Sequence, residues 1–86
     1  MPVYVSAHTT ACLTKQALRH LMQTLLRATD VTVRRCVASQ IAGRMITEAE
    51  APDQSAVEKF FQAQHVNCEW IMRIDLDGKD GDVLDS

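Results

Sequence analysis

Two amphipathic helical patterns, separated by two short strand patterns, restrict the folds available to this chain of 86 residues. LTKQALRHLMQTLLRAT at 13–29 and PDQSAVEKFFQAQ at 52–64 both repeat apolar side chains at helical spacing. Between them, VTVRRCVAS at 31–39 and RMITEAEA at 44–51 are rich in β-branched residues, and they are joined around Gly43. This predicts a β-hairpin between two helices. A chain of this length has room for one core, so both helices must cover the same sheet.

A strand pattern flanks this central part on each side. VYVSAH at 3–8 and CEWIMRIDL at 68–76 both alternate apolar and polar residues. The complete order is β-α-β-β-α-β, which predicts an α+β, ferredoxin-like domain. Its antiparallel four-stranded sheet has the spatial order 4-1-3-2 and carries both helices on one face. We expect Thr14 to cap the first helix, and Asp53 or Ser55 to cap the second.

The chain is predicted to form one domain over residues 1–77, followed by a flexible acidic tail at 78–86. The tail is rich in Asp and Gly, which favours mobility. Its aspartates resemble a calcium loop in part. However, Lys79 and Ser86 occupy positions where a calcium loop that starts at Asp75 needs oxygen ligands, and a solvated tail is the better interpretation.

The formal net charge is −2 and the nine basic residues are scattered, so the basic patch typical of a nucleic-acid-binding protein is missing. No apolar run is long enough to span a membrane, and no secretory signal pattern is present. We therefore expect a cytoplasmic protein with neither nucleic acid nor membrane as a partner. Three widely spaced cysteines in a reducing compartment are expected to be free thiols or metal ligands.

Two His–Cys pairs, HTTAC and HVNC, suggest a metal site. The first pair follows the first strand and the second pair leads into the last one, and these two strands are predicted to be antiparallel neighbours. The four residues would meet at one end of the sheet: His8, Cys12, His65 and Cys68. Thiolate and imidazole ligands suit nickel or zinc. The alternative is that the cysteines are small buried apolar residues, which is also our interpretation of Cys36.

The sheet face away from the helices is a second candidate site. If Val3, Val5, Trp70, Met72 and Ile74 pack on the helices, the other face forms a mixed polar pocket. Its lining would be Tyr4, Ser6, Arg44, Glu69, Ile71 and Arg73, with His8 beside them. Tyr4, His8 and Arg73 are then candidate catalytic residues. The alternative is a solvated or dimer-covered face with ion pairs such as Glu69–Arg73.

The stretch VRRCVASQIAGRMITEAEAPDQSAVEKFFQAQHVNCEWIMRI, with its EAPD motif, and the opening MPVYV carry a resemblance to known proteins. The chain resembles small uncharacterised bacterial ferredoxin-like families of the dimeric α+β barrel kind, over residues 1–76. One of these families includes a nickel-binding member. The resemblance implies a homodimer that associates through the open sheet face, but it assigns no ligand residue.

Three functions follow as hypotheses. The first is a small dimeric binding or accessory domain, with nickel or zinc held by the His/Cys residues. The second is a small dimeric enzyme, isomerase-like or monooxygenase-like, that uses the pocket on the open face. The third is a purely structural or interaction role. A tautomerase that uses Pro2 is disfavoured, because it would need a free amine at that residue and fits the four-strand pattern poorly.

Overall fold

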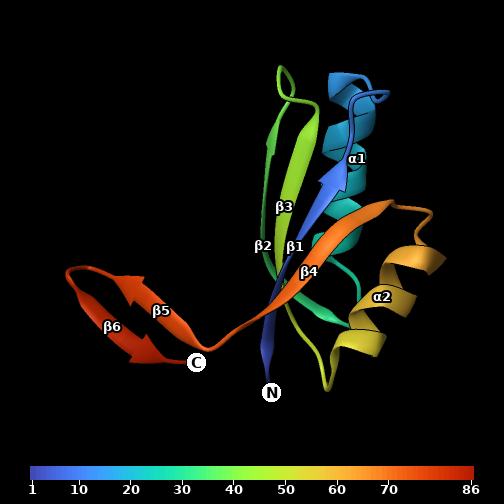
Figure 1. The fold of residues 1–86 in the computed structure, drawn as a ribbon. Coiled ribbons are helices and arrows are strands. Elements are labelled where there is room, and N and C mark those ends of the chain that lie inside the picture. Colours follow the sequence, from blue (N-terminus) through green and yellow to red (C-terminus); the bar gives the residue numbers. More distant parts are fainter.

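The computed structural model describes all residues from Met1 to Ser86. In chain order its elements are β1 (Val3–Thr9), α1 (Lys15–Leu26), β2 (Thr32–Ser39), β3 (Arg44–Glu50), α2 (Gln54–Ala63), β4 (Cys68–Ile74), β5 (Leu76–Lys79) and β6 (Asp82–Asp85). The first six elements form a layered body, and the last two form a separate hairpin (Figure 1). No helix is long and apolar enough to cross a membrane.

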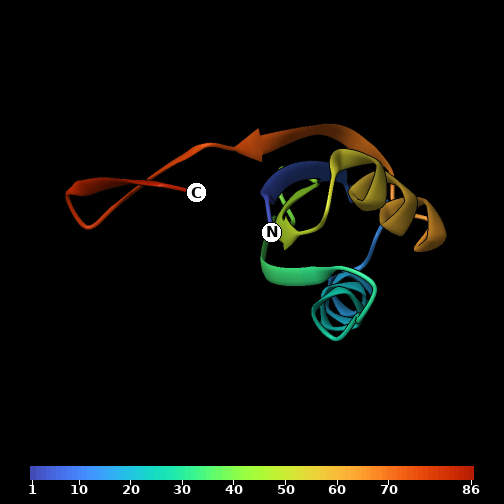
Figure 2. The same cartoon turned by 90° about the horizontal axis from the view of Figure 1, so that it is seen from below.

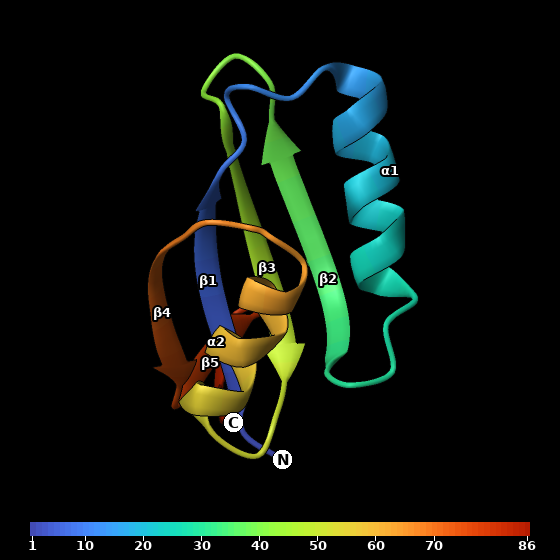
Figure 3. The ribbon, with the colours of Figure 1, turned by 90° about the vertical axis from the view of Figure 1, so that its right-hand side faces the viewer.

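The main sheet has four antiparallel strands in the order β2-β3-β1-β4, which is the order expected from the sequence. Both helices cover one face of this sheet and leave the other face open (Figures 1 and 3). The chain is therefore an α+β protein, and its architecture is compatible with the ferredoxin-like fold. The predicted helix starts also hold. Thr14 caps α1 by accepting a hydrogen bond from the Ala17 N–H, and Asp53 caps α2 in the same way through Ala56.

The core lies between the helices and the sheet. Its largest fully buried side chains include Phe61 from α2, Leu25 from α1 and Met45 from β3. The helical stripe predicted for α1 is confirmed at Leu18 and Leu25, which are both buried. Phe60 and Phe61 pack edge to face, with ring centroids 5.1 Å apart. These contacts fix α2 over the middle of the sheet, and this decides which β1 side chains it covers.

The face predicted for β1 is wrong. Tyr4, Ser6 and His8 point toward the helices, where they are 5%, 1% and 0% exposed. The predicted inward residues of β4 are wrong as well, because Trp70 and Met72 are about half exposed on the open face. Side chains of β1 do alternate between the two faces as predicted, but the polar residues of β1 lie on the helix-covered face and not on the open one. β1 is an inner strand with both faces largely covered, and its polar residues satisfy one another inside the core.

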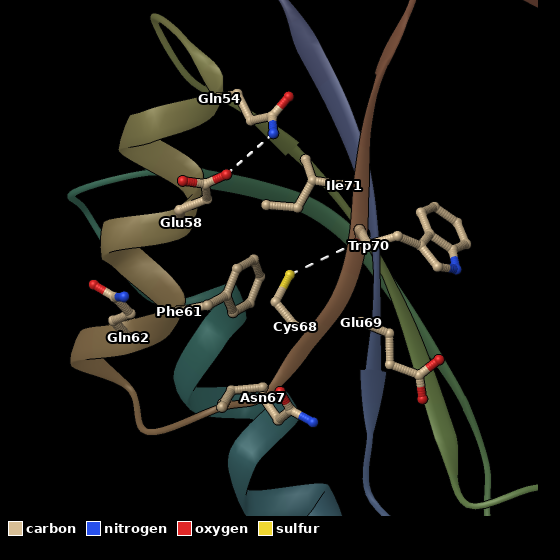
Figure 4. Close-up of a pocket in the computed structure, with 10 residues that line it drawn as sticks. Gln54, Glu58, Phe61, Gln62, Asn67, Cys68, Glu69, Trp70 and Ile71 are labelled. Carbon is tan, nitrogen blue, oxygen red and sulfur yellow. Dashed lines mark hydrogen bonds between the residues drawn. The ribbon is translucent and has the colours of Figure 1, made fainter.

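Each edge strand contains a β-bulge. In β2 the register with β3 shifts between Val33 and Arg35. In β4 the register with β1 shifts next to His8, so that Cys68 pairs with His8 and Trp70 with Ala7. The extra residue, Glu69, therefore lies on the same side of β4 as Trp70, while Cys68 points toward α2 (Figure 4). This bulge is the reason that Glu69 faces the open side as predicted, whereas Ile71 does not.

The acidic segment at 78–86, which the sequence predicts to be a flexible tail, forms most of a β-hairpin. β5 and β6 pair in register from Leu76–Asp85 to Lys79–Asp82. Asp80 and Gly81 form the turn, with φ of 56° and 79°. Positive φ at both turn residues is typical of a type I′ turn, whose twist suits a two-residue hairpin. The hairpin leaves the end of β4 and projects away from the helices (Figure 2).

Candidate functional site

A chain of buried hydrogen bonds links β1, β3 and the start of β4. Ser6 Oγ lies 2.8 Å from His8 Nε2 and 2.5 Å from Thr47 Oγ1. His8 Nδ1 lies 3.1 Å from the carbonyl oxygen of Asn67. The His8 ring also packs on Phe61, with centroids 4.2 Å apart. The His8 ring thus contacts β1, β3, α2 and the residue that precedes β4.

The direction of each hydrogen bond in this chain follows from the Asn67 carbonyl. A carbonyl oxygen only accepts, so His8 Nδ1 carries the proton and donates it. Nε2 is then the acceptor and receives the Ser6 hydroxyl hydrogen. The Ser6 oxygen in turn accepts the hydrogen bond from Thr47. Thr47 Oγ1 is also 3.3 Å from Nε2, a longer and weaker contact.

This hydrogen-bond network stabilises the core and is not a catalytic site. Its Ser–His–carbonyl connectivity resembles that of an activated nucleophile. However, Ser6 and His8 are 1% and 0% exposed, so no substrate reaches them from solvent. Burial lowers the pKa of His8 below its ordinary value of 6.5, although the Asn67 carbonyl and the charge of Glu69 oppose that shift. His8 is therefore held neutral, and it satisfies polar groups within the core.

The four proposed metal ligands do not come together. His8 is buried with both ring nitrogens in hydrogen bonds, and Cys68 lies opposite it on β4. Cys12 and His65 are exposed in the loops that follow β1 and α2. No group of three or more His, Cys, Asp or Glu side chains is arranged to hold a metal ion. Strand order brought the two segments to one end of the sheet as expected, but side-chain direction separates the ligands.

The residues predicted to line the open-face pocket lie on opposite faces of the sheet. Of its residues, Arg44 and Glu69 do lie on the open face and form an ion pair at 3.6 Å, and Glu69 also accepts a hydrogen bond from Thr9. Tyr4, Ser6 and Ile71 point toward the helices instead. Arg73 pairs with Asp75 at 3.6 Å, not with Glu69. Tyr4 and His8 are consequently absent from the face where we expected them to act.

The open face instead carries one apolar row across all four strands. Val37 of β2 pairs with Ile46 of β3, Ile46 with Ala7 of β1, and Ala7 with Trp70 of β4. Val37 and Trp70, at the two ends of the row, are 44% and 43% exposed. Met72, two residues after Trp70 on the same face of β4, is 52% exposed. We call these five residues the apolar row.

A cavity of about 450 Å³, which no sequence pattern predicts, lies between α2 and the edge strand β4 (Figure 4). Phe61, Cys68 and Ile71 point into the space between helix and strand. Along α2, Gln54 donates a hydrogen bond of 3.0 Å to Glu58. No lysine or arginine lines the cavity. Its rim is therefore polar with acidic character, and its floor is apolar.

Cys68 does not provide a reactive thiol to this cavity. Burial raises its pKa above the ordinary 9.0, and the nearby Glu58 carboxylate raises it further. Its S–H also donates a weak hydrogen bond to the Trp70 carbonyl oxygen at 3.8 Å. The neutral thiol is the poorer nucleophile and the poorer metal ligand. The cavity is thus suited to binding by polar contacts.

Comparisons of the chain with protein-family models, with curated proteins and with solved structures found no match.

Proposed function

We propose that the protein is a homodimeric binding module whose two sheets pack together through their open faces. The observation that carries this proposal is the apolar row. Four apolar side chains run from one edge of the sheet to the other, Met72 adjoins them on β4, and three of these five residues are about half exposed. An isolated domain of this size buries a modest part of its surface, so covering this row would stabilise it considerably.

A second copy of the chain is the occupant that fits this face best. The face carries both signs of charge, with Arg35 opposite Glu48 in one row and Arg44 paired with Glu69 in another. Such a face is self-complementary, as a two-fold symmetric interface requires. Sheet-on-sheet packing of two such faces would make the α+β barrel that the resemblance implies.

The test is to place a charge in the row. We expect Trp70→Asp and Met72→Asp to convert the dimer into a monomer, because each puts a carboxylate into an apolar interface without a partner. Native mass spectrometry and size-exclusion chromatography with light scattering measure the mass. Ile41→Asp is the matched control, because Ile41 is fully exposed in the β2–β3 turn, away from the row.

A wild-type chain that stays monomeric at high micromolar concentration contradicts the dimer. So does a dimer that both Trp70→Asp and Met72→Asp leave intact. The enzyme alternative on the open face is weakened independently of this test, since Tyr4 and His8 are directed into the core.

The cavity between α2 and β4 supports a second part of the proposal, namely the ligand site of the module. Most of its lining, including Glu58, Phe61 and Ile71, lies on the helix side of β4, away from the proposed dimer face, whereas Glu69 and Trp70 belong to its edge on the open side. Glu58 on its rim and the absence of a cation in its lining favour a ligand with an ammonium group, and Phe61 and Ile71 favour an apolar portion.

Benzylamine and benzoate are suitable probes of the cavity. We expect benzylamine to perturb the amide resonances of residues along α2 and β4, and benzoate not to, because the two probes differ mainly in charge. Glu58→Gln should remove this selectivity, whereas Asp53→Asn, outside the cavity lining, should keep it. Equal responses to both probes would contradict the site.

A further inference from the structure

We propose that the β5–β6 hairpin is a dimerisation arm that lies against the β2 edge of the partner subunit. This inference rests on the dimer proposed above and names the residues that determine its geometry. The hairpin, Leu76 to Asp85, is well formed although it projects away from the body (Figures 1 and 2). An isolated two-stranded hairpin is only marginally stable in water, so a docking surface for it is expected.

The apolar side chains of the hairpin are left uncovered by its own protomer. Leu76, Val83 and Leu84 are 66%, 62% and 58% exposed. The register places Leu76 and Val83 on one face of the hairpin and Leu84 on the other. Both faces thus carry apolar surface, which is unusual for a segment that is exposed to water throughout.

Charge identifies the complementary surface. Residues 75–86 carry five aspartates and one lysine, a formal charge of −4, while the whole chain carries −2. Arg34 and Arg35 are exposed side by side at the bulge of β2, and neither forms an ion pair within the protomer, although Arg34 lines a small cavity of about 100 Å³ together with Leu76, Asp77 and Ser86 of its own chain. In a symmetric dimer the acidic arm of each protomer pairs with the basic β2 edge of the other, so the same interaction forms twice.

The path of the arm agrees with this pairing. It starts where Ile74 pairs with Val3, in the same row as Glu50 and Thr32, so it leaves the sheet at the level where β2 begins. When two open faces stack about a two-fold axis parallel to the strands, each β4 edge lies over the partner's β2 edge. An arm that projects from the open side then reaches Arg34 and Arg35 of the partner subunit.

The other simple arrangement is disfavoured by charge. An axis perpendicular to the strands would place β4 over β4, with the ends reversed. The arm would then approach Glu69 of the partner subunit, a like charge whose only cation within reach, Arg44, is already paired with it. The size of the interface also favours the arm. The arm adds area to the sheet-face contact, and a standard interface buries about 800 Å² on each partner.

The test is complementation between two full-length charge variants. One variant carries Arg34→Glu and Arg35→Glu, and the other carries Asp77→Lys and Asp85→Lys. These aspartates lie on opposite faces of the hairpin, outside the turn, and form no side-chain hydrogen bond. Each variant alone should dimerise about tenfold more weakly than the wild type, because like charges meet at both arms. Mixed together, they should form the heterodimer, in which both arms meet opposite charges.

A matched control removes the effect of overall charge. Lys15→Glu with Arg19→Glu, exposed on α1, changes the formal charge as the β2 variant does. We expect this control to dimerise as the wild type does and to show less preference for the Asp77→Lys/Asp85→Lys chain. Native mass spectrometry distinguishes all of these species by mass.

Two outcomes would overturn the inference in different ways. If the wild type dimerises but neither charge variant weakens the dimer, the arm lies elsewhere and the sheet-face dimer still holds. If both variants weaken the dimer but mixing does not restore it, the arm contacts its own protomer. A wild type that never dimerises removes the proposed function itself.

Discussion

His8 and Cys68 face each other across adjacent antiparallel strands, and both side chains point toward α2. They are neighbours without being ligands of a common ion. The His8 ring nitrogens are occupied by Ser6 and the Asn67 carbonyl, and the Cys68 thiol is directed to the Trp70 carbonyl. This part of the molecule therefore joins strands to a helix, and its contribution is measurable as stability.

The Ser6–Thr47 hydrogen bond should show strong coupling in a double-mutant cycle. Ser6→Ala and Thr47→Val each leave a buried polar group without its partner, at a cost of about 1–3 kcal/mol. The double variant removes both hydroxyls together but also leaves His8 Nε2 without a donor, so its loss should differ from the sum of the two single losses. Urea unfolding at a fixed protein concentration measures all four proteins. Strictly additive losses would mean that the two hydroxyls do not interact.

Stability should fall as the pH drops below about 6.5, because burial lowers the pKa of His8 in the folded state. In the unfolded state His8 binds a proton near pH 6.5, but the folded state resists protonation down to its lower pKa. The unfolded state therefore binds more protons in this window, and acidification favours it by up to about 1.4 kcal/mol per pH unit.

His8→Gln removes this titration. The variant should be less stable than the wild type at pH 7.5, and it should lose less further stability on going to pH 5.5. His20→Gln, on the exposed face of α1, should behave as the wild type does. Parallel pH profiles for the wild type and His8→Gln would contradict the explanation.

The three thiols should react with iodoacetamide in a fixed order. Cys12 is exposed, whereas burial raises the pKa of Cys36 and Cys68. Since the thiolate is the reacting form, Cys12 should be alkylated at pH 8 faster than the other two by about tenfold or more. Peptide mass spectrometry over time follows each site. Equal rates in the native protein would contradict the burial of Cys36 and Cys68, and denatured protein provides the reference.

Gly43 should tolerate alanine poorly. Its φ is +66°, and an added Cβ would lie 2.8 Å from Ala11 Cβ, in the loop that is also held by the Thr10 N–H to Gly43 carbonyl hydrogen bond. Gly43→Ala combines backbone strain with a steric clash, so we expect it to cost about 2–4 kcal/mol. Gly81→Ala is the control, because Gly81 has a similar φ of +79° but open space around it. Comparable thermal shifts for the two variants would show that the Ala11 contact is unimportant.

The sequence predicted the strand order and the helix starts because local signals determine them. Thr14 and Asp53 are capping residues followed by apolar periodicity, and these features act within a few residues. The hairpin at the end of the chain also had a local signal, Asp80-Gly81, but the acidic composition around it pointed to a mobile tail. A turn signal between short segments was the more informative feature.

The buried network was not predictable in this way. Thr47, which completes the network, is about forty residues away from Ser6 in the sequence, and no local pattern near Ser6 predicts their contact. If the contact with Thr47 is not known, a serine and a histidine at alternate positions of a strand predict that their face is exposed to solvent. The bulge at Glu69 added a second error, since one extra residue reverses the alternation for the remainder of β4.

The two bulges, one in each edge strand, also affect which surfaces of the chain can pair with another copy of it. A regular edge strand exposes a ladder of unpaired N–H and C=O groups, onto which another sheet adds end to end and grows into a fibre. Here β2 and β4 are each interrupted close to their first residues, at Arg34 and Glu69 respectively. Lateral growth of the sheet is thereby disfavoured at both edges, so the proposed self-association through the open face would end after a single partner.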